Sequence, residues 1–257
     1  RQTDNEYAKI LNRLRVGQIT KKTINTLEQC MNKSIDEDNP TILLPRRKDA
    51  DKINKVRLDK LDKNTEKIFK MTIVNPEELP LSKEQLNNIN MFTSTEKQQE
   101  REYLSNNLMA EKEINLRIGA HVMCIANLNL DSDMPIVNGS QGIIVDFVDG
   151  FPLVKFNNRS IGQLMTNHTW QSEKILGIAV KQIPLIYAWA ITIHKAQGIT
   201  LDKALVDIGE QVFECGQTYV ALSRIKSLEG LYLKNFDYTK IKINKIVKAF
   251  YELLEQK

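Results

Sequence analysis

The stretch Tyr187-Ala-Trp-Ala-Ile-Thr-Ile-His-Lys-Ala-Gln-Gly-Ile-Thr-Leu-Asp202 leads an apolar strand directly into a polar turn. The polar residues at the end of the strand, and the glycine after them, are Thr192, His194, Lys195, Gln197 and Gly198. A second stretch, Gly216-Gln-Thr-Tyr-Val-Ala-Leu-Ser-Arg224, carries one arginine to the end of an apolar run. This layout predicts an α/β lobe that presents one loop to nucleic acid and an arginine to a bound nucleotide.

The chemistry of these side chains suits phosphate. The guanidinium of Arg224 matches the charge that spreads over a γ-phosphate during its transfer. Lys195 can neutralise a backbone phosphate, and His194 and Gln197 can hydrogen-bond to backbone or base. Simpler interpretations remain open at this point: Arg224 could make a surface salt bridge, and the polar turn could be an ordinary helix start.

The flanking sequence alternates helices and strands. Apolar residues from Tyr7 to Leu14 recur at helical spacing, and Gly17 is placed to end that helix. We expect further helices at 20–31, 48–61, 217–223 and 243–254, with Ile53 and Val56 on one face of the second of these. Strands are expected at 41–44, 188–193, 204–208 and 231–236. This order is typical of a layered α/β domain.

The middle of the chain has a different character. Residues 68–74 alternate well enough for one strand, and 75–115 is polar, with Ser82-x-x-Gln85 as a candidate capping box. Short strands are then expected at 121–128, 142–148 and 153–156. Asn138-Gly139 and Asp149-Gly150 are dipeptides that accept positive φ and favour tight turns. Several short strands with tight turns predict a small barrel that interrupts the α/β domain.

Composition limits the remaining possibilities. The net charge of +4 is a weak indication of a polyanionic partner, and no apolar stretch reaches the roughly 18 residues that span a bilayer. Cys30, Cys124 and Cys215 have neither zinc-ligand nor disulfide-framework spacing, which favours a reducing intracellular compartment. His121 and His168 have no partner at metal-binding spacing, so no metal site is predicted. The exposed-looking cluster Arg46-Arg47-Lys48 could touch phosphate or simply begin a solvated helix.

The two quoted stretches resemble motifs V and VI of the PIF and RecD-like DNA helicases of superfamily 1B. Two further segments look like the hallmark of the insertion domain in that family: Leu116-Arg-Ile-Gly-Ala-His-Val-Met-Cys-Ile-Ala-Asn127 and Val137-Asn-Gly-Ser-Gln-Gly142. Arg1-Gln2 resembles motif IV. The resemblance implies an α/β fold in which a RecA-like parallel-sheet domain is interrupted by a small SH3-like β-barrel insertion. It divides the chain into 1–65 and 187–257 for the RecA-like domain 2A, and 66–186 for the insertion domain 2B.

The same resemblance implies the C-terminal motor lobe of an ATP-dependent helicase that moves 5′ to 3′ on single-stranded DNA. Arg224 would be catalytic, and Arg1, Gly198 and Arg224 would contact the ATP. Thr192, His194, Lys195 and Gln197 would contact nucleic acid, and the implied partners are single-stranded DNA and duplex junctions.

The phosphate loop expected of such a motor is not found in this sequence. Gly17-Gln-Ile-Thr-Lys-Lys-Thr23 lacks the second glycine that lets the backbone wrap a phosphate, and Asp36-Glu37-Asp38 does not follow a buried strand. The chain begins at Arg1 rather than at methionine. A missing N-terminal lobe is therefore expected to supply the phosphate loop and the ligands of Mg²⁺, and the chain alone is predicted to be inactive.

Two other functions remain open. One is a non-enzymatic nucleic-acid-binding or partner-docking module derived from a helicase, and the other is a relaxase or recombination enzyme with a helicase-like lobe. Arg224 argues against the first, because a pure binding module has no need of a γ-phosphate sensor.

Overall fold

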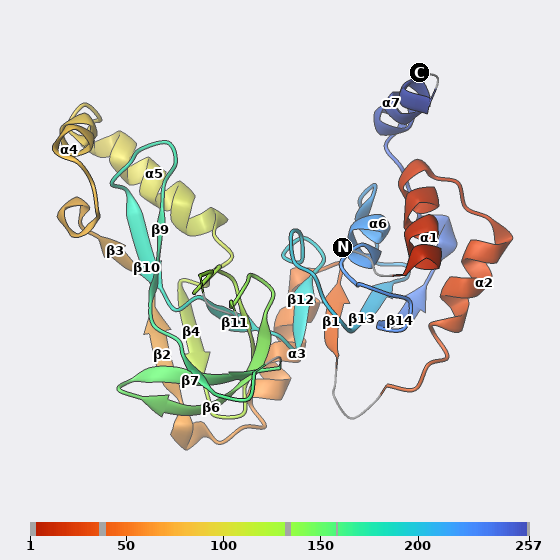
Figure 1. The fold of residues 1–257 in the computed structure, drawn as a ribbon, viewed down its shortest axis with the longest axis horizontal. Coiled ribbons are helices and arrows are strands. Elements are labelled where there is room, and N and C mark those ends of the chain that lie inside the picture. The colour runs from red at the N-terminus through yellow and green to blue at the C-terminus, as the bar shows by residue number, and fades with distance from the viewer. Residues whose placement is uncertain (1–3, 36–39, 132–134, 158, 256–257) are drawn as a thin grey trace. The chain divides into compact units, whose positions relative to one another are not determined.

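The computed structural model describes residues 4–35, 40–131, 135–157 and 159–255. These residues form two compact units, each described here by itself (Figure 1). Unit 1 contains the chain up to Arg57 and again from Ala188 onward, and unit 2 contains Leu58–Tyr187. No helix in the described part of the chain is long and apolar enough to cross a membrane.

Unit 1 is built on a four-stranded parallel sheet in the order β12-β1-β13-β14. Its strands are β1 (Thr41–Leu44), β12 (Ala190–Thr192), β13 (Ala204–Ile208) and β14 (Leu231–Phe236). Most of their apolar residues are buried, as expected for a parallel sheet covered by helices on both faces. The predicted mixed α/β fold with a parallel sheet is thereby confirmed.

The helices of unit 1 follow the predicted starts and stops closely. They are α1 (Asn5–Val16), α2 (Lys21–Gln29), α3 (Arg47–Leu58), α6 (Gln217–Leu222) and α7 (Lys245–Glu255), with the short 3-10 turn η3 (Tyr238–Lys240). Asp4 accepts hydrogen bonds from the first amides of α1, and Gly17 ends that helix with a φ of 75°. Thr20 caps α2 in the same way as Asp4 caps α1.

The two apolar residues expected on one face of α3 differ in burial. Ile53 packs partly buried against Leu44, Ala50 and Ala190, whereas Val56 is 51% exposed. The buried residue is Asn54, whose amide nitrogen donates to the Ala190 carbonyl at 2.8 Å and whose amide oxygen accepts from the Ala190 N–H at 2.9 Å. Because β12 is an edge strand, this side chain satisfies the backbone groups that a further strand would otherwise pair.

Unit 2 contains a five-stranded antiparallel sheet in the order β11-β5-β6-β7-β8. Its strands are β5 (His121–Cys124), β6 (Gln141–Val148), β7 (Phe151–Phe156), β8 (Gln163–Leu164) and β11 (Leu185–Tyr187). Asp149 and Gly150, at φ of 49° and 82°, form the two-residue turn between β6 and β7. The predicted tight turn at this dipeptide is confirmed, and its positive φ values match a type I′ hairpin.

The described residues of unit 2 also form two small sheets and two helices. β3 (Thr72–Val74), β10 (Ala179–Gln182) and β9 (His168–Gln171) form one sheet, and β2 (Lys67–Lys70) pairs with β4 (Glu113–Leu116). The helices are α4 (Lys83–Ile89) and α5 (Ser94–Asn107), and the 3-10 turns are η1 (Lys63–Thr65) and η2 (Pro76–Glu78). The predicted capping box of Ser82 and Gln85 is present at the start of α4.

Two details of this region differ from the expectation. The predicted single strand over 68–74 is divided into β2 and β3, which pair in different sheets. Residues 58–65, assigned from the sequence to the first domain, belong to unit 2. Arg117 holds them there, since its guanidinium donates to the carbonyls of Leu58 and Leu61 and forms a 2.7 Å ion pair with Glu66.

Candidate nucleic-acid interface

The predicted loop leaves β12 as a tight turn over residues 193–198. Thr192 is buried, and its hydroxyl accepts a hydrogen bond from the Lys195 N–H at 3.2 Å. The Thr192 carbonyl also accepts from the Ala196 N–H at 3.0 Å, and Ile193 N–H donates to Leu44 of the adjacent strand β1. Thr192 therefore shapes the turn from its buried side, together with the buried residues Ile193 and Ala196.

The remaining predicted residues of this loop lie on its outer side. His194 and Gln197 are exposed and Lys195 is half-buried. Gly198 has a φ of 84°, with no atom within 4 Å of where a Cβ would stand, so backbone conformation rather than crowding favours glycine there. The structure thus brings the four polar residues predicted from the sequence into one turn at the end of one strand.

His194 is held by a partner that the sequence analysis did not identify. Its Nε2 lies 3.0 Å from a carboxylate oxygen of Glu214, and its ring centroid lies 6.3 Å from that of Phe213. Glu214 belongs to the connection between β13 and α6, only two residues before the quoted stretch that begins at Gly216. A glutamate so close to that stretch was the available signal.

The connection that carries Glu214 is itself braced from α6. Gln217 is 3% exposed, and its amide oxygen accepts from the N–H groups of Phe213 and Glu214 at 3.1 and 3.4 Å. Gly216, at a φ of 76°, donates its N–H to the Lys242 carbonyl at 2.8 Å. The turn from 213 to 217 therefore has a defined shape before any ligand binds.

Arg224 lies just beyond the C-terminal end of α6. Its Nε donates to the Val220 carbonyl at 3.0 Å, and its Nη2 donates to the Ser223 hydroxyl at 2.8 Å. These bonds direct a half-buried guanidinium, which carries five N–H donors in a fixed plane and is suited to phosphate oxygens.

The backbone at Arg224 is joined to the segment that follows the polar loop. The Leu201 N–H donates to the Arg224 carbonyl at 2.8 Å, and the Lys226 N–H donates to the Leu201 carbonyl at 3.2 Å. This forms a parallel bridge between Leu201 and Ile225. The two stretches that the sequence singled out therefore meet within unit 1, and their backbones are directly bonded.

Helix α1, near the start of the chain, is hydrogen-bonded to the last residue of α6. The Tyr7 hydroxyl donates to the Leu222 carbonyl at 2.6 Å, and burial raises the pKa of Tyr7 well above its ordinary value. Asp4 caps α1 and also accepts from the Leu228 N–H at 3.3 Å. Its backbone hydrogen bonds, chiefly that from Tyr7, lower the pKa of its carboxyl. Buried Tyr7 and partly buried Asp4 thus join α1 to the segment on either side of Arg224.

Other residues singled out in the sequence lie outside the described residues or at the start of α3. Arg1, proposed as a second nucleotide contact, and the acidic residues of 36–38 lie outside the described residues. The cluster at 46–48 is exposed at the start of α3, where Arg47 pairs with Asp51 at 3.5 Å. That geometry is typical of a solvated helix start.

No metal-binding cluster is found among the described residues: within them, no group of three or more His, Cys, Asp or Glu could hold an ion. His168 packs edge-on against Trp170, with centroids 4.7 Å apart, and burial lowers its pKa. Cys30, Cys124 and Cys215 are free cysteines. Burial raises the pKa of the Cys124 thiol to about 11, which keeps it protonated at neutral pH.

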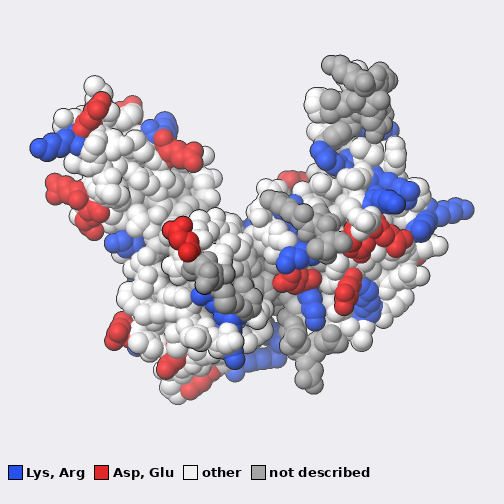
Figure 2. All heavy atoms as spheres, viewed as in Figure 1, with Lys and Arg blue, Asp and Glu red and all other residues white. Residues whose placement is uncertain are grey.

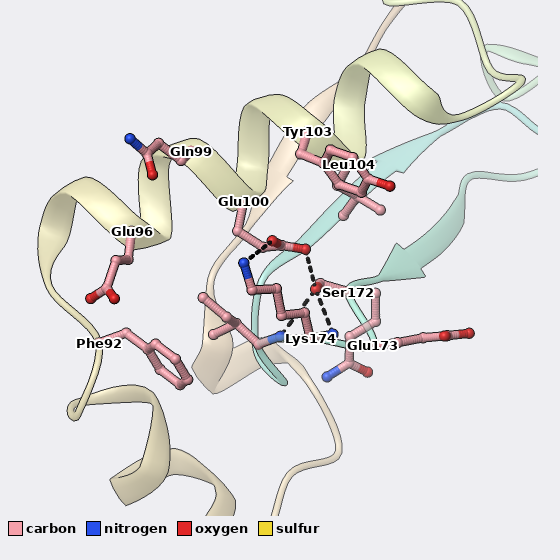
Figure 3. A pocket seen from close by; sticks show the side chains of 11 residues that line it. Phe92, Glu96, Gln99, Glu100, Tyr103, Leu104, Ser172, Glu173 and Lys174 are labelled. Atoms are coloured by element: carbon pink, nitrogen blue, oxygen red, sulfur yellow. Dashed lines mark hydrogen bonds and ion pairs between the residues drawn. The ribbon is translucent and has the colours of Figure 1, made fainter.

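A pocket of about 730 Å³ lies in unit 2 between α5 and residues 171–175 (Figure 3). Figure 3 shows Glu100 pointing across it toward Ser172 and Lys174. Glu100 accepts from the Ser172 hydroxyl at 2.6 Å and lies 3.8 Å from the Lys174 ammonium. None of the residues predicted to bind DNA or nucleotide lines this pocket.

On one face of the molecule the surface charge is mixed. On the face drawn in Figure 2, basic and acidic side chains are interspersed over each unit, with no broad field of one sign. This face therefore offers a polyanion no broad basic field.

Comparison with known proteins identifies the relatives of this chain. Residues 101–147 match the family model described as "DNA helicase Pif1, 2B domain". The chain is 31% identical over 263 residues to "ATP-dependent DNA helicase PIF1" of Danio rerio, a match that covers 100% of this chain and 37% of the relative. It is also 31% identical to the Pif1 helicase of Bdellovibrio bacteriovorus, covering 99% of this chain and 53% of the relative.

Solved structures give the same result. Unliganded Pif1 from Bacteroides sp. matches with a TM-score of 0.75 and 25% identity, over 100% of this chain and 56% of that chain. The Bacteroides protein has also been solved in complex with ADP-AlF4, with a TM-score of 0.72, 25% identity and coverage of 99% and 55%. Its form bound to ssDNA matches with a TM-score of 0.60, 26% identity and coverage of 99% and 55%.

Proposed function

Because this chain resembles part of the Pif1-type DNA helicases over its whole length, as predicted from its sequence, we propose that it is the C-terminal motor lobe of an ATP-dependent DNA helicase. The chain spans about half of the bacterial relative and just over a third of the fish relative. The remaining length would contain the N-terminal lobe with its phosphate loop.

The observation that carries this proposal is the hydrogen-bonded junction of the two singled-out stretches. The polar turn at 193–198 and Arg224 share one parallel-sheet unit, and the Leu201–Ile225 bridge joins their backbones. A motor needs a nucleotide-sensing group and a DNA-contacting group on one rigid element. A conformational change at the nucleotide then moves the group that contacts DNA.

For DNA, the proposal assigns backbone contacts on single strands to His194, Lys195 and Gln197. Thr192 would contribute by shaping the turn, because its hydroxyl is already bonded to the Lys195 N–H. The ssDNA-bound Bacteroides relative supports single-stranded DNA as the partner. Movement from 5′ to 3′ and action at duplex junctions follow from the family resemblance alone.

For nucleotide, the proposal places Arg224 beside the γ-phosphate of ATP bound mainly by the missing lobe. ATP with Mg²⁺ would supply the phosphoryl group and the charge-neutralising ion. The part of this chain that the structure describes offers the guanidinium but no cluster of metal ligands. Arg224 would stabilise charge on the transferring oxygens, and Gly198 and Arg1 would line the same site. The relative with bound ADP-AlF4 supports nucleotide use.

Unit 2 would be the insertion domain 2B, interrupting a RecA-like domain 2A. The match of 101–147 to a 2B model and the five-stranded antiparallel sheet support this assignment. The SH3-like barrel would be formed around that sheet. The three free cysteines fit a reducing intracellular compartment, which remains part of the proposal.

The decisive test compares the chain alone with the longer helicase. We expect the 257-residue chain to bind single-stranded DNA but to hydrolyse no ATP, because half a cleft cannot preorganise Mg²⁺ and water. The longer protein should hydrolyse ATP, with stimulation by single-stranded DNA. Turnover by the purified chain would contradict the half-motor assignment. DNA binding by a longer protein that never hydrolyses ATP would favour the alternative of a non-enzymatic binding module.

A further inference from the structure

We propose that Glu214 is a positioning residue that orients His194 for DNA and links this contact to α6, at whose end Arg224 lies. This inference rests on the proposed function. It adds a residue that the resemblance does not assign and states how the two ends of the motor unit communicate.

The imidazole of His194 lies against two side chains, those of Glu214 and Phe213. An exposed histidine after a turn samples many rotamers, and ordering it on binding costs free energy. The Glu214 carboxylate at 3.0 Å from Nε2, together with the Phe213 ring, restricts it before DNA arrives. With Nε2 bonded to the carboxylate, Nδ1 is the ring nitrogen left to face a ligand.

The backbone at Glu214 is hydrogen-bonded to the first residue of α6. Its own N–H and that of Phe213 donate to the buried side-chain oxygen of Gln217, the first residue of α6. The backbone that carries the carboxylate is therefore hydrogen-bonded to the helix. A rotation or shift of α6 would move the 213–214 backbone and, through the contact between the carboxylate and Nε2, the imidazole.

A second link, formed by backbone hydrogen bonds, joins the polar loop to the segment that carries Arg224. The Leu201 backbone bonds to Arg224 and Lys226, so the exit of the polar loop is also joined to the segment that carries the arginine. The loop over 193–198 is thus connected to the α6 segment on both sides: through His194 and Glu214, and through Leu201. The side-chain link can be removed by substitution, whereas the backbone link remains.

The energetics favour a positioning role over a stabilising one. The side chains of His194 and Glu214 are 48% and 55% exposed, and exposed pairs contribute little to folding. Substituting Glu214 should therefore leave the fold intact, which permits a clean functional test. A residue of purely structural value would instead be expected in a buried pair.

The experiment is a double-mutant cycle on single-stranded DNA affinity, with His194→Ala, Glu214→Ala and the double variant in the 257-residue chain. We expect Glu214→Ala to weaken binding about fivefold, on the order of one oriented hydrogen bond. It should have no further effect in the His194→Ala background. Glu214→Gln keeps an oxygen that can accept from Nε2 and should restore most of the affinity. Glu210→Ala, an exposed glutamate of the same connection, is the matched control and should bind as the wild type does.

The link to α6 is measured in the longer helicase. There the change in single-strand affinity caused by a non-hydrolysable ATP analogue should shrink in Glu214→Ala, because the coupling free energy is carried partly by this contact. Additive losses in the cycle, a Gln variant as weak as Ala, or an unchanged nucleotide effect would each overturn the proposal. If His194→Ala binds normally while the wild type binds DNA, this inference fails and the helicase assignment stands. If the wild type binds no single-stranded DNA, the proposed function itself fails and takes this inference with it.

Discussion

Two ion pairs, one in each unit, differ in what surrounds them. Arg117 and Glu66 of unit 2 lie 2.7 Å apart with side chains only 7% and 21% exposed, and Arg117 also donates to two carbonyls. His194 and Glu214 of unit 1 lie 3.0 Å apart with side chains about half exposed. The first pair joins segments far apart in sequence and stabilises a fold. The second pair contributes little to stability, and its half-exposed side chains remain accessible to a ligand.

Charge alone therefore does not mark a functional residue in this chain. Both pairs are formed by residue types that bind phosphate or metal elsewhere. What separates them is whether the polar atoms are already satisfied by the protein, because a buried and fully bonded arginine cannot exchange its partners without a large penalty. Substitutions on either side of this divide should therefore affect different measurements.

The largest effect is expected for Arg224→Ala in the longer helicase. Removing the guanidinium from the γ-phosphate should reduce ATP hydrolysis by about 10³-fold or more, while nucleotide and single-strand binding remain largely intact. Steady-state hydrolysis and DNA binding measured on the same preparation provide the comparison.

Arg13→Ala is the matched control for Arg224, because Arg13 is exposed on α1 of the same unit. It should hydrolyse ATP normally. Arg224→Ala could instead lose nucleotide and single-strand binding while hydrolysis per bound ATP stays normal. Arg224 would then have a structural role, as Arg117 does.

The largest effect on stability is expected for Arg117→Met. It leaves the Glu66 carboxylate without its partner and removes two hydrogen bonds to carbonyls. Breaking a buried pair in this way costs about 3–5 kcal/mol of unfolding free energy. Urea denaturation of the chain measures it, since its midpoint should fall.

The control for Arg117 is Lys70→Ala, which removes an exposed pair with Glu113 in the same unit. Its side chains are 71% and 52% exposed, so the loss should be below about 1 kcal/mol. Equal losses of unfolding free energy in the two variants would mean that burial does not decide how much each ion pair stabilises the fold.

A large part of unit 1 could be predicted from the sequence, because its signals are local. The spacing from Tyr7 to Leu14, the glycine at 17 and the apolar runs at 41–44 and 204–208 each specify an element without knowledge of the rest. The polar turn after β12 and Arg224 stand at the ends of apolar runs, which made them candidates, and the family resemblance assigned their roles.

The parts that were missed depend on contacts between distant segments. Asn54 was overlooked on α3 because its partner is the Ala190 backbone, 136 positions away in the chain. The division of 68–74 into two strands is set by pairing with β4 and β10, which no local pattern encodes. Glu214 and Gln217 were missed because each acts through another residue rather than on a ligand.

A smaller effect on stability is expected for Asn54→Ala. The substitution leaves the buried N–H and C=O of Ala190 without their side-chain partners on the edge of the sheet, a loss of about 1–3 kcal/mol. Because β12 leads directly into the polar turn, single-strand binding should weaken as well. Asn88→Ala, an exposed asparagine on α4, is the control and should change neither quantity. Normal DNA binding by a clearly destabilised Asn54 variant would show that the turn does not depend on the support of β12.

The smallest effect is expected for Lys195→Ala, and it tests the exposed side of the comparison most directly. If Lys195 contacts a phosphate, its removal should weaken single-strand binding about equally on mixed and homopolymer strands, because phosphates carry no sequence information. The slope of log affinity against log salt should also fall in magnitude by roughly 0.7, the value for one released counterion on a single strand. Thermal stability should change little, since the Lys195 backbone N–H that is bonded to the Thr192 hydroxyl is kept. Lys203→Ala, an exposed lysine of the same unit, gives the reference slope. A Lys195 variant with the same slope as that reference and as the wild type touches no phosphate, and the DNA-facing assignment of the turn would then lose its main support.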